Sequence, residues 1–239
     1  MSLISNEKLF QVTKKTLLEA GAIVRKGFHR KKQVKFKSVI SPVTQIDVAA
    51  EKKIISTIES HFKGHAFLGE ESAYLQKQSL GPAKKDQYRW VIDPLDGTVN
   101  FIHGIPQTSV SVGVERNGVV LVGGVYDVHR DELFMAMKGK GATLNGKKIR
   151  VSPESSYQRS LLITGFPYER HGEVRKYLDI LEEMLSGCMD VRRFGSAAID
   201  LCWVASGRAE GYWESKLSPW DVAAGSLILE EAGGRITNF

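Results

Sequence analysis

Two aspartates stand three residues apart in the stretch Trp-Val-Ile-Asp-Pro-Leu-Asp-Gly-Thr-Val-Asn-Phe, residues 90–101. Asp93 and Asp96 flank Pro94, whose fixed φ and missing N–H are expected to end a strand and force a turn. In that turn both carboxylates can point the same way, with the carbonyl of Leu95 left unpaired between them. Carboxylate and carbonyl oxygens are hard ligands, which suit Mg²⁺ better than zinc or copper. The stretch therefore predicts a magnesium site at the end of an apolar strand.

Gly97 and Thr98 follow directly and open a segment that can form a short helix. Glycine lets another group approach the backbone closely, and the exposed N–H groups at a helix start attract phosphate. The stretch therefore places an anion site directly beside the metal site. Without a cation the two neighbouring carboxylates would repel each other and one pKa would rise, and a bound metal removes that penalty. A simpler interpretation stays open at this point, in which Asp93 and Asp96 only cap the helix in an ordinary Asp-Pro turn.

Three further acidic positions favour the metal interpretation, because each stands at the end of an expected strand or the start of an expected helix. Gly69–Ser72 contains two glutamates and follows the short strand 65–69, in the kind of loop that carries function. Asp221 begins a helix after Trp220, and Glu214 ends a short strand before it. Each of them, taken alone, is equally a helix cap or a surface acid. Their joint pattern is more specific than any one of them.

The elements that must position these residues change in character along the chain. Apolar residues at helical spacing predict amphipathic helices at 6–28 and 47–62. Alternating side chains around Asn117-Gly118 and again before Asn145-Gly146 predict an antiparallel meander. From Ser160 onward, strands and helices alternate: strands at 161–165 and 211–215, helices at 173–186, 196–207 and 220–234. We expect one domain over residues 1–239, with an N-terminal α+β half (about 1–155) and a C-terminal α/β half (about 156–239).

The composition of the 239 residues, 42% hydrophobic and 25% charged, is that of a soluble globular protein. No apolar run approaches the roughly 20 residues that cross a bilayer, and the first ten residues are too polar for a signal peptide. Cys188 and Cys202 lack metal-ligand spacing, so two reduced thiols are expected, with a disulfide as the alternative. We therefore expect a cytoplasmic location without membrane association.

The net charge is +6, from 33 basic and 27 acidic residues, and suits an anionic substrate or a weak contact with nucleic acid. The basic residues gather at Arg25–Lys37, without the aromatic interleaving of an RNA-binding module. Two interpretations of this basic run stay open: a solvated helix end and loop, or a surface near a negatively charged ligand. Nucleic-acid binding is not the expected function.

Three blocks of the chain resemble the signatures of the inositol monophosphatase family, which belongs to the Mg²⁺-dependent, lithium-sensitive phosphatases: residues 69–72, 90–106 and 220–234. Residues 43–47 and 192–214 also resemble family patterns, so the resemblance runs from about residue 6 to the end. It implies an alternating αβαβα sandwich with mixed and antiparallel sheets, and a homodimer. Members usually continue beyond the glycine pair that is Gly233-Gly234 here, which puts the last sheet edge, stability and dimer packing in doubt.

The resemblance also implies a role for each matched residue. Glu70, Asp93 and the Leu95 carbonyl would hold a first Mg²⁺, with Glu71 as a supporting residue. Asp93, Asp96 and Asp221 would hold a second ion, and Glu70 would help to hold a third through water. Thr98, supported by Asp47 and Glu70, would position the attacking water. The remaining matches are substrate contacts: the N–H groups of Gly97 and Thr98 for the phosphate, and Gly195, Ser196, Ala197 and Glu214 for the alcohol.

The implied chemistry is hydrolysis of a phosphate monoester, in which a metal lowers the pKa of bound water and paired metals clamp the attacking and leaving oxygens. The expected reaction converts myo-inositol monophosphate and water to myo-inositol and phosphate, with lithium as an inhibitor. Sister activities share the metal residues and stay open: hydrolysis of fructose 1,6-bisphosphate, histidinol phosphate, NADP or 3′-phosphoadenosine 5′-phosphate. Glu214 favours a small phosphorylated polyol or sugar over an adenine nucleotide. A third alternative is a regulatory relative that binds RNA or the transcription machinery.

The segments expected to choose the substrate among these are 192–197, 214–219 and 166–170.

Overall fold

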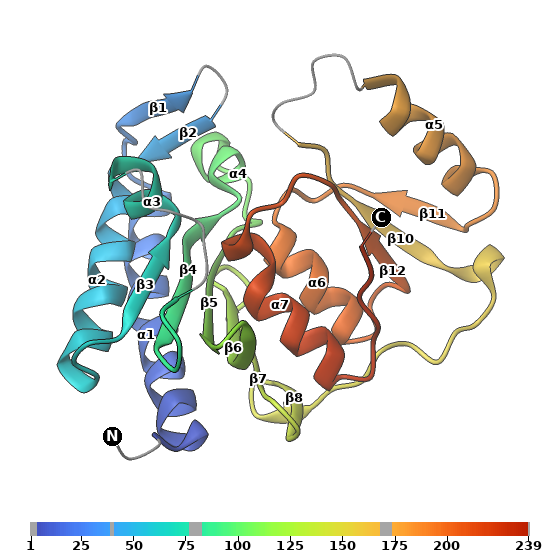
Figure 1. The fold of residues 1–239 in the computed structure, drawn as a ribbon. Coiled ribbons are helices and arrows are strands. Elements are labelled where there is room, and N and C mark those ends of the chain that lie inside the picture. Colours follow the sequence, from blue (N-terminus) through green and yellow to red (C-terminus); the bar gives the residue numbers. More distant parts are fainter. Residues whose placement is uncertain (1–3, 39–40, 77–82, 168–173, 239) are drawn as a thin grey trace.

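The computed structural model describes residues 4–38, 41–76, 83–167 and 174–238, and it stacks five alternating layers of helices and sheets (Figure 1). Helices α1 (Asn6–Phe28) and α2 (Gln45–His61) cover one face of a seven-stranded sheet, and α6 (Ala197–Ala205) and α7 (Pro219–Glu231) cover the other. A three-stranded sheet follows, with α5 (Val174–Leu185) outermost. This order confirms the predicted αβαβα sandwich.

The seven-stranded sheet contains the predicted meander, and its strands lie side by side in chain order. Only the first pair, β3 and β4, is parallel, and the later neighbours are antiparallel. Both Asn-Gly turns adopt positive φ at their two residues, as a two-residue hairpin turn of this kind requires. The strands are β3 (Ala66–Gly69), β4 (Tyr88–Asp96), β5 (Ser109–Arg116), β6 (Val119–Asp127), β7 (Glu132–Met137), β8 (Gly141–Leu144) and β9 (Lys147–Lys148).

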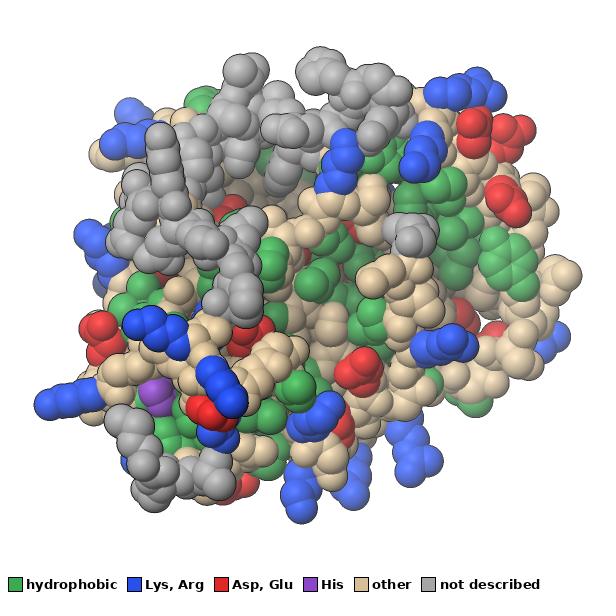
Figure 2. Space-filling model, in the orientation of Figure 1, with side chains coloured by type: hydrophobic (Ala, Val, Ile, Leu, Met, Phe, Trp, Pro, Cys, Tyr) green, Lys and Arg blue, Asp and Glu red, His purple; other side chains and the backbone are tan. Residues whose placement is uncertain are grey.

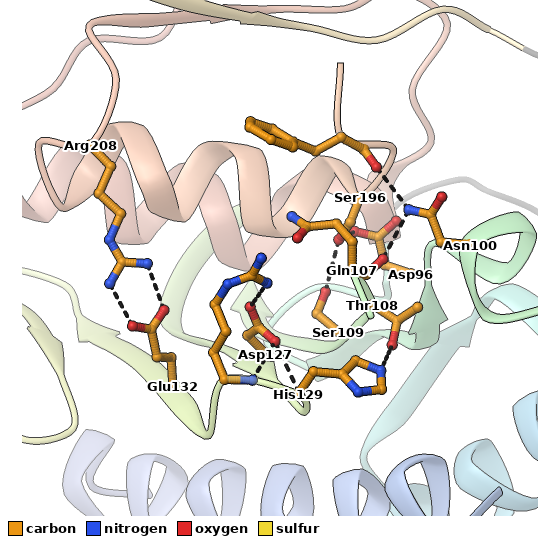
Figure 3. Close-up of polar contacts among 12 residues, drawn as sticks. Asp96, Asn100, Gln107, Thr108, Ser109, Asp127, His129, Glu132, Ser196 and Arg208 are labelled. Atoms are coloured by element: carbon orange, nitrogen blue, oxygen red, sulfur yellow. Dashed lines mark hydrogen bonds and ion pairs between the residues drawn. The ribbon is translucent and has the colours of Figure 1, made fainter. Parts of the chain in front are cut away.

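The smaller sheet belongs to the C-terminal half and is entirely parallel, as alternating strands and helices predict. Strand β10 (Leu161–Thr164) lies between β11 (Asp190–Arg192) and β12 (Gly211–Trp213). An ion pair between Arg208 and Glu132, with nitrogen–oxygen distances of 2.5 and 2.6 Å, ties the end of α6 to the larger sheet (Figure 3). The two halves are therefore joined at the face that α6 and α7 cover.

Each face of the larger sheet has its own hydrophobic core. Leu17, Ile54 and Trp90 lie in the cluster under α1 and α2, where the predicted helical stripes are buried. Phe134 and Ile228 lie in the cluster that joins the opposite face of the sheet to α6, α7 and β10. None of the helices in the described ranges is long and apolar enough to cross a membrane.

Two short elements differ from the sequence predictions. The basic run was expected to be a helix end and loop, but β1 (Val34–Ser38) and β2 (Ser41–Thr44) form an antiparallel hairpin within and after it. Val34 and Phe36 alternate with lysines there, a strand pattern that the charges obscure. Residues Glu70–Gln76, expected as a loop, form the helix α3, while α4 (Thr98–His103) is the predicted short helix. A 3-10 turn at Tyr157–Arg159 precedes β10.

Candidate active site

Strand β4 carries both aspartates and does not end at Pro94, so the predicted end of the strand is wrong. Asp93 pairs with Ser111 of β5, and Asp96 pairs with Ser109. Three steps along β4 therefore match two steps along β5, which is a β-bulge with one extra residue. In a regular strand, residues three apart face opposite sides of the sheet. The bulge returns Asp96 to the side of Asp93, and so produces the shared direction that the turn was expected to give.

One cavity of about 120 Å³ collects most of the predicted site residues. The exceptions are Asp47 and Ser196, which are fully buried and hydrogen-bond to residues of the cavity wall. The wall is formed by the following residues: Glu70, Asp93, Leu95, Asp96, Gly97, Thr98, Gly195, Ala197, Glu214 and Asp221 of the predicted set, together with Phe166, Pro167, Arg193, Ser215, Lys216 and Leu217. The fold therefore brings five segments that are distant in the sequence to one place.

Glu70 reaches this cavity because β3 and β4 are parallel neighbours. Gly69, the last residue of β3, lies opposite Ile92, so Glu70 and Asp93 follow at the same edge of the sheet. The sequence left open which of two adjacent glutamates faces the site. Glu70 lines the cavity, whereas Glu71 is only 3% exposed and does not line it.

The start of α2 places Asp47 behind Thr98. Asp47 forms a capping box with Thr44, because its Oδ2 accepts the Thr44 backbone N–H at 2.9 Å. The other oxygen, Oδ1, accepts a hydrogen bond from Thr98 Oγ1 at 3.1 Å. Burial raises the pKa of the Asp47 carboxyl. The cap therefore fixes the carboxylate that in turn orients the threonine hydroxyl.

Thr98 Oγ1 also lies 3.0 Å from the carbonyl oxygen of Leu95, which the sequence analysis expected to be unpaired. That expectation is wrong because α4 begins close enough for its first side chain to reach back. A carbonyl oxygen has two lone pairs, so this hydrogen bond does not prevent it from acting as a ligand. Both Leu95 and Thr98 line the cavity.

Asp96 lies at the amino end of α6. Its Oδ2 accepts a hydrogen bond from Ser196 Oγ at 2.6 Å (Figure 3). The same oxygen accepts a hydrogen bond from the Ala198 backbone N–H at 2.8 Å. Burial nevertheless raises the pKa of Asp96 to about 6, against these two hydrogen bonds and with the help of the charges on Glu214 and Glu70. Ser196, predicted as a substrate contact, is placed by the structure as a partner of Asp96.

Asp221 reaches the cavity from the first turn of α7. Its Oδ2 accepts the Ser218 backbone N–H at 2.6 Å, a second capping box, with Pro219 at the first helical position. Burial and then the negative charge of Asp96 raise the pKa of Asp221 well above its ordinary value. Asp221 is thus both a helix cap and a cavity residue, so for this aspartate the two interpretations are compatible. In the described structure no side chain caps α4, so Asp93 and Asp96 are not its caps.

Gly97 provides the close approach that the sequence predicts. Its φ of 88° is left-handed, and an added Cβ would lie 2.8 Å from the Gln107 carbonyl oxygen. Asn100, one turn later, donates from Nδ2 to the carbonyls of Gln107 at 3.0 Å and Phe194 at 2.8 Å (Figure 3). Asn100 therefore ties the segment before α6 to the start of α4, which brings Gly195 to the cavity.

Glu214 forms the far side of the cavity, just after β12. Its carboxylate accepts a hydrogen bond from Tyr212 Oη at 2.5 Å. The carboxylate also packs against Gly165, where an added Cβ would lie only 1.9 Å from Glu214 Oε2. Burial raises the pKa of Glu214, and the nearby Arg193 opposes that rise. Arg193 itself is exposed at the rim. A carboxylate in this position can accept hydrogen bonds from hydroxyl groups.

The donor set of the cavity is chemically suited to a hard cation, since it consists of carboxylate and carbonyl oxygens. Burial and the neighbouring negative charges raise the pKa values of Asp96 and Asp221, so a bound cation would favour their charged forms. Within the described ranges, no three acidic, histidine or cysteine side chains are already arranged as a metal cage. The carboxylates repel one another, and a bound cation would offset this repulsion. We therefore expect their side chains to turn toward a cation when one binds.

Three residues of this region were missed by sequence reasoning. Asn100 and Glu51 act through backbone groups, and Asp200 of α6 is 1% exposed with no hydrogen-bond partner for either carboxyl oxygen in the described structure. Burial and the charge of Asp96 raise the pKa of Asp200 well above its ordinary value. A signal existed for Glu51, because it interrupts the apolar stripe of a predicted helix four residues after Asp47.

A larger cavity of about 750 Å³ lies between β12, the two helices α6 and α7, and residues 234–238. It shares Glu214–Leu217 with the smaller cavity but contains none of the aspartates. The larger cavity therefore lacks the aspartates that make the smaller one the candidate site.

Comparisons with known proteins agree with this geometry. The inositol monophosphatase family model matches residues 5–239. Among curated relatives, "Nus factor SuhB" of Pasteurella multocida is 41% identical over 92% of this chain and 81% of its own length. "Phosphatase IMPL1, chloroplastic" of Arabidopsis thaliana is 40% identical over 99% of this chain and 64% of its own length. Among solved structures, an inositol monophosphatase from Anabaena superposes with a TM-score of 0.83 at 39% identity, covering 96% of this chain and 83% of that one.

Proposed function

The chain belongs to the inositol monophosphatase family, and from this premise we propose that it is a Mg²⁺-dependent phosphate monoester hydrolase with myo-inositol monophosphate as its substrate. One observation carries the proposal. The acidic residues Asp93, Asp96 and Asp221 line the same cavity as Thr98, whose hydroxyl is hydrogen-bonded to the buried Asp47. Such a cavity supplies both a site for hard cations and an oriented hydroxyl beside it.

The metal end of the proposed site uses ligands from three elements. Glu70, Asp93 and the Leu95 carbonyl would hold one ion; Asp93, Asp96 and Asp221 would hold a second; and Glu70 would assist a third through water. The family is generally Mg²⁺-dependent. Bound Mg²⁺ would supply charge neutralisation at phosphorus and a more acidic water.

The protein's own contribution to hydrolysis begins at Thr98. Its hydroxyl has one proton to donate, and two acceptors lie within reach: Asp47 Oδ1 at 3.1 Å and the Leu95 carbonyl oxygen at 3.0 Å. With the Leu95 carbonyl engaged by a cation, the proton would go to Asp47, and a lone pair of the hydroxyl would face the attacking water. Thr98 thereby accepts a hydrogen bond from the water and orients it. Gly97 and Thr98 stand at the start of α4, and their N–H groups would hold the phosphate.

The alcohol end of the proposed site is formed by Glu214, with Gly195 and Ala197 opposite. Glu214 accepts a hydrogen bond from Tyr212, and its carboxylate at the cavity wall would accept further hydrogen bonds from a leaving alcohol with several hydroxyls. A flat adenine ring would find no aromatic stacking partner among the described wall residues except Phe166. These features support a polyol or sugar phosphate.

Sister phosphatase activities share the metal end and differ at the alcohol end. Of the segments expected to choose the substrate, 192–197 and 214–219 contribute to the cavity wall, and 168–170 lie outside the described residues. The informative experiment measures phosphate release from a panel: inositol 1-phosphate, fructose 1,6-bisphosphate, histidinol phosphate, NADP and 3′-phosphoadenosine 5′-phosphate. Each is tested with Mg²⁺, without Mg²⁺, and with added lithium.

We expect inositol 1-phosphate to be hydrolysed fastest, only with Mg²⁺, and with inhibition by lithium. A different preferred substrate would move the assignment to that sister activity. Failure on the whole panel would contradict the catalytic proposal.

We further propose a homodimer in the cytoplasm. Val174, Leu178 and Leu185 are each about half exposed and lie on one face of α5, because they are four and seven residues apart. Light scattering after gel filtration tests the dimer, and a monomer at micromolar concentration would contradict it.

A regulatory role in transcription is the second candidate, because curated relatives carry the name Nus factor SuhB. The basic run Arg25–Lys37 could bind RNA or an acidic partner, but some of its side chains already contact other residues of this protein. Arg25 donates to Tyr126 and Asp131, and Lys32 lies over the rings of Phe28 and Phe101. On the face shown in Figure 2, basic side chains are interspersed with acidic ones. These observations make nucleic-acid binding the weaker candidate.

A further inference from the structure

Glu51 is a buried acid that no part of the proposed mechanism uses. It lies in α2, one turn after Asp47, and is 5% exposed. Both of its carboxyl oxygens are engaged: Oε2 accepts the Glu71 backbone N–H at 2.9 Å, and Oε1 accepts the Ser72 backbone N–H at 2.8 Å. The carboxylate thus bridges two consecutive amides of another helix.

Those two amides belong to the first turn of α3, which begins at Glu70. The first N–H groups of a helix have no partner inside the helix, so a partner from elsewhere decides where the helix starts. Helix α3 has only seven residues, too few to be stable by itself in water. Its position, and with it the position of Glu70, therefore depends on tertiary contacts such as the one with Glu51.

The junction between β3 and α3 is closely fitted to this carboxylate. A Cβ added to Gly69 would lie 2.4 Å from Glu51 Oε2, so any side chain at that position would displace the bond. Glycine therefore allows the chain to turn from β3 into α3 directly over the carboxylate. A strand end, a helix start and one acid from α2 form a single local unit.

We propose that Glu51 is a positioning residue that holds the start of α3, so that Glu70 faces the metal end of the cavity. The inference rests on the proposed metal-dependent function, because it assigns Glu51 to the support of a metal ligand. Helix α2 then supports the site twice on one face: Asp47 orients Thr98, and Glu51 orients Glu70.

Glu51→Gln is the sharpest variant. Glutamine keeps the volume and can accept one amide N–H through its oxygen, but its NH₂ group then faces the second N–H, which repels it. The start of α3 is expected to shift while the core stays intact. Glu51→Asp keeps the charge on a shorter side chain, and its effect should lie between wild type and Glu51→Gln.

Glu231→Gln is the matched control. Glu231 also accepts two backbone N–H bonds, from Gly139 at 2.6 Å and Gly141 at 2.7 Å, but at the turn between β7 and β8 and outside the cavity wall. The Glu231→Gln substitution disturbs the same type of carboxylate–amide interaction, at a place that has no predicted metal ligands.

The test combines Mg²⁺ titration calorimetry of each protein without substrate and steady-state kinetics over a range of Mg²⁺ concentrations. For Glu51→Gln we expect a rise of about tenfold or more in the Mg²⁺ dissociation constant and in the Mg²⁺ concentration for half-maximal activity. At saturating Mg²⁺ the substrate KM should change less than twofold, since Glu51 is not a substrate contact. Glu231→Gln should bind Mg²⁺ as wild type does.

Wild-type Mg²⁺ affinity in Glu51→Gln, or an equal loss in Glu231→Gln, would overturn the positioning role while leaving the phosphatase proposal intact. If Glu51→Gln does not fold, Glu51→Asp decides, and an unchanged Mg²⁺ affinity in it overturns the inference. A wild-type protein that neither binds Mg²⁺ nor releases phosphate overturns the proposed function together with the inference.

Discussion

The two ends of the candidate cavity are built differently. At the metal end, Asp47 and Asp221 are helix caps, and Asp96 accepts two hydrogen bonds at the start of α6. At the alcohol end, Glu214 has one side-chain partner, and Arg193 is exposed. Secondary structure itself fixes the metal end, whereas residues after short strands form the other. From this difference we propose that the metal end determines the reaction type and the alcohol end determines the substrate.

The largest effect is expected from Asp93→Asn at the metal end. Loss of the residue proposed to bridge two ions should lower kcat/KM about a thousandfold or more, about 4 kcal/mol of transition-state stabilisation, by the same factor for every substrate. Phosphate release with Mg²⁺ measures it, and circular dichroism checks the fold. Unchanged Mg²⁺-dependent hydrolysis in Asp93→Asn would contradict the proposed role of the metal end.

The pH dependence of stability tests the same end without substrate. In the metal-free protein Asp96 has a pKa of about 6, against an ordinary value of 3.8. The folded state therefore holds the Asp96 proton more tightly than the unfolded state does, so the contribution of Asp96 to stability is fully present below pH 4 and is lost as the pH rises to about 6. The loss is at most about 3 kcal/mol. Urea denaturation at several pH values measures it.

Added Mg²⁺ should restore this stability above pH 6 and have little effect at pH 4, where protons compete for the carboxylates. The control is Asp96→Asn, in which the fall between pH 4 and pH 6 should be much smaller. A metal-free protein that becomes more stable over this range would contradict the account of the buried charges.

Thr98→Val tests the Thr98 hydroxyl, which is hydrogen-bonded to the capping residue Asp47 and is proposed to orient the attacking water. Valine preserves the shape but cannot accept a hydrogen bond from water or donate to Asp47, so kcat should fall about a hundredfold. The dissociation constant of Mg²⁺ should change little, because the Thr98 hydroxyl is not among the proposed metal ligands. Thr98→Ser keeps the hydroxyl and should retain most of the activity. Equal kinetics for both variants would show that the hydroxyl has no role.

Glu214→Gln should give the smallest and most selective effect. The ratio of kcat/KM for inositol 1-phosphate to that for 4-nitrophenyl phosphate, which has no hydroxyls on its leaving group, should fall about tenfold, equivalent to about 1.4 kcal/mol. Hydrolysis of the aryl phosphate should be nearly unchanged. An equal loss of kcat/KM on both substrates would show that Glu214 does not recognise the hydroxyls of the leaving group. The proposed difference between the metal end and the alcohol end would then be wrong.

Much of this site was predictable because its motifs are local. The stretch that contains Asp93, Asp96 and Thr98 joins an apolar strand to a helix start within nine residues, and the structure brings its side chains to one cavity. The β-bulge was not predictable in this way. It depends on the register with β5, and Pro94 alone is equally compatible with the end of a strand.

The supporting residues were missed for a different reason. Glu51 and Asn100 act on backbone groups of segments 20 and 94 residues away, so no local pattern contains both partners. Helix α3 is short, and propensity alone does not predict it without the cap that Glu51 provides. The hairpin of β1 and β2 was overlooked because lysines alternate with its apolar residues. Long-range capping and register therefore set the limit of the sequence analysis.

The central claim is that divalent cations bind at the metal end of the candidate cavity. Anomalous diffraction from a crystal soaked in Mn²⁺ tests this claim most directly. The account predicts manganese peaks inside the cavity, one near Glu70, Asp93 and the Leu95 carbonyl and a second near Asp93, Asp96 and Asp221. A protein that hydrolyses phosphate esters with Mn²⁺ in solution, but shows no manganese in this cavity, would contradict it.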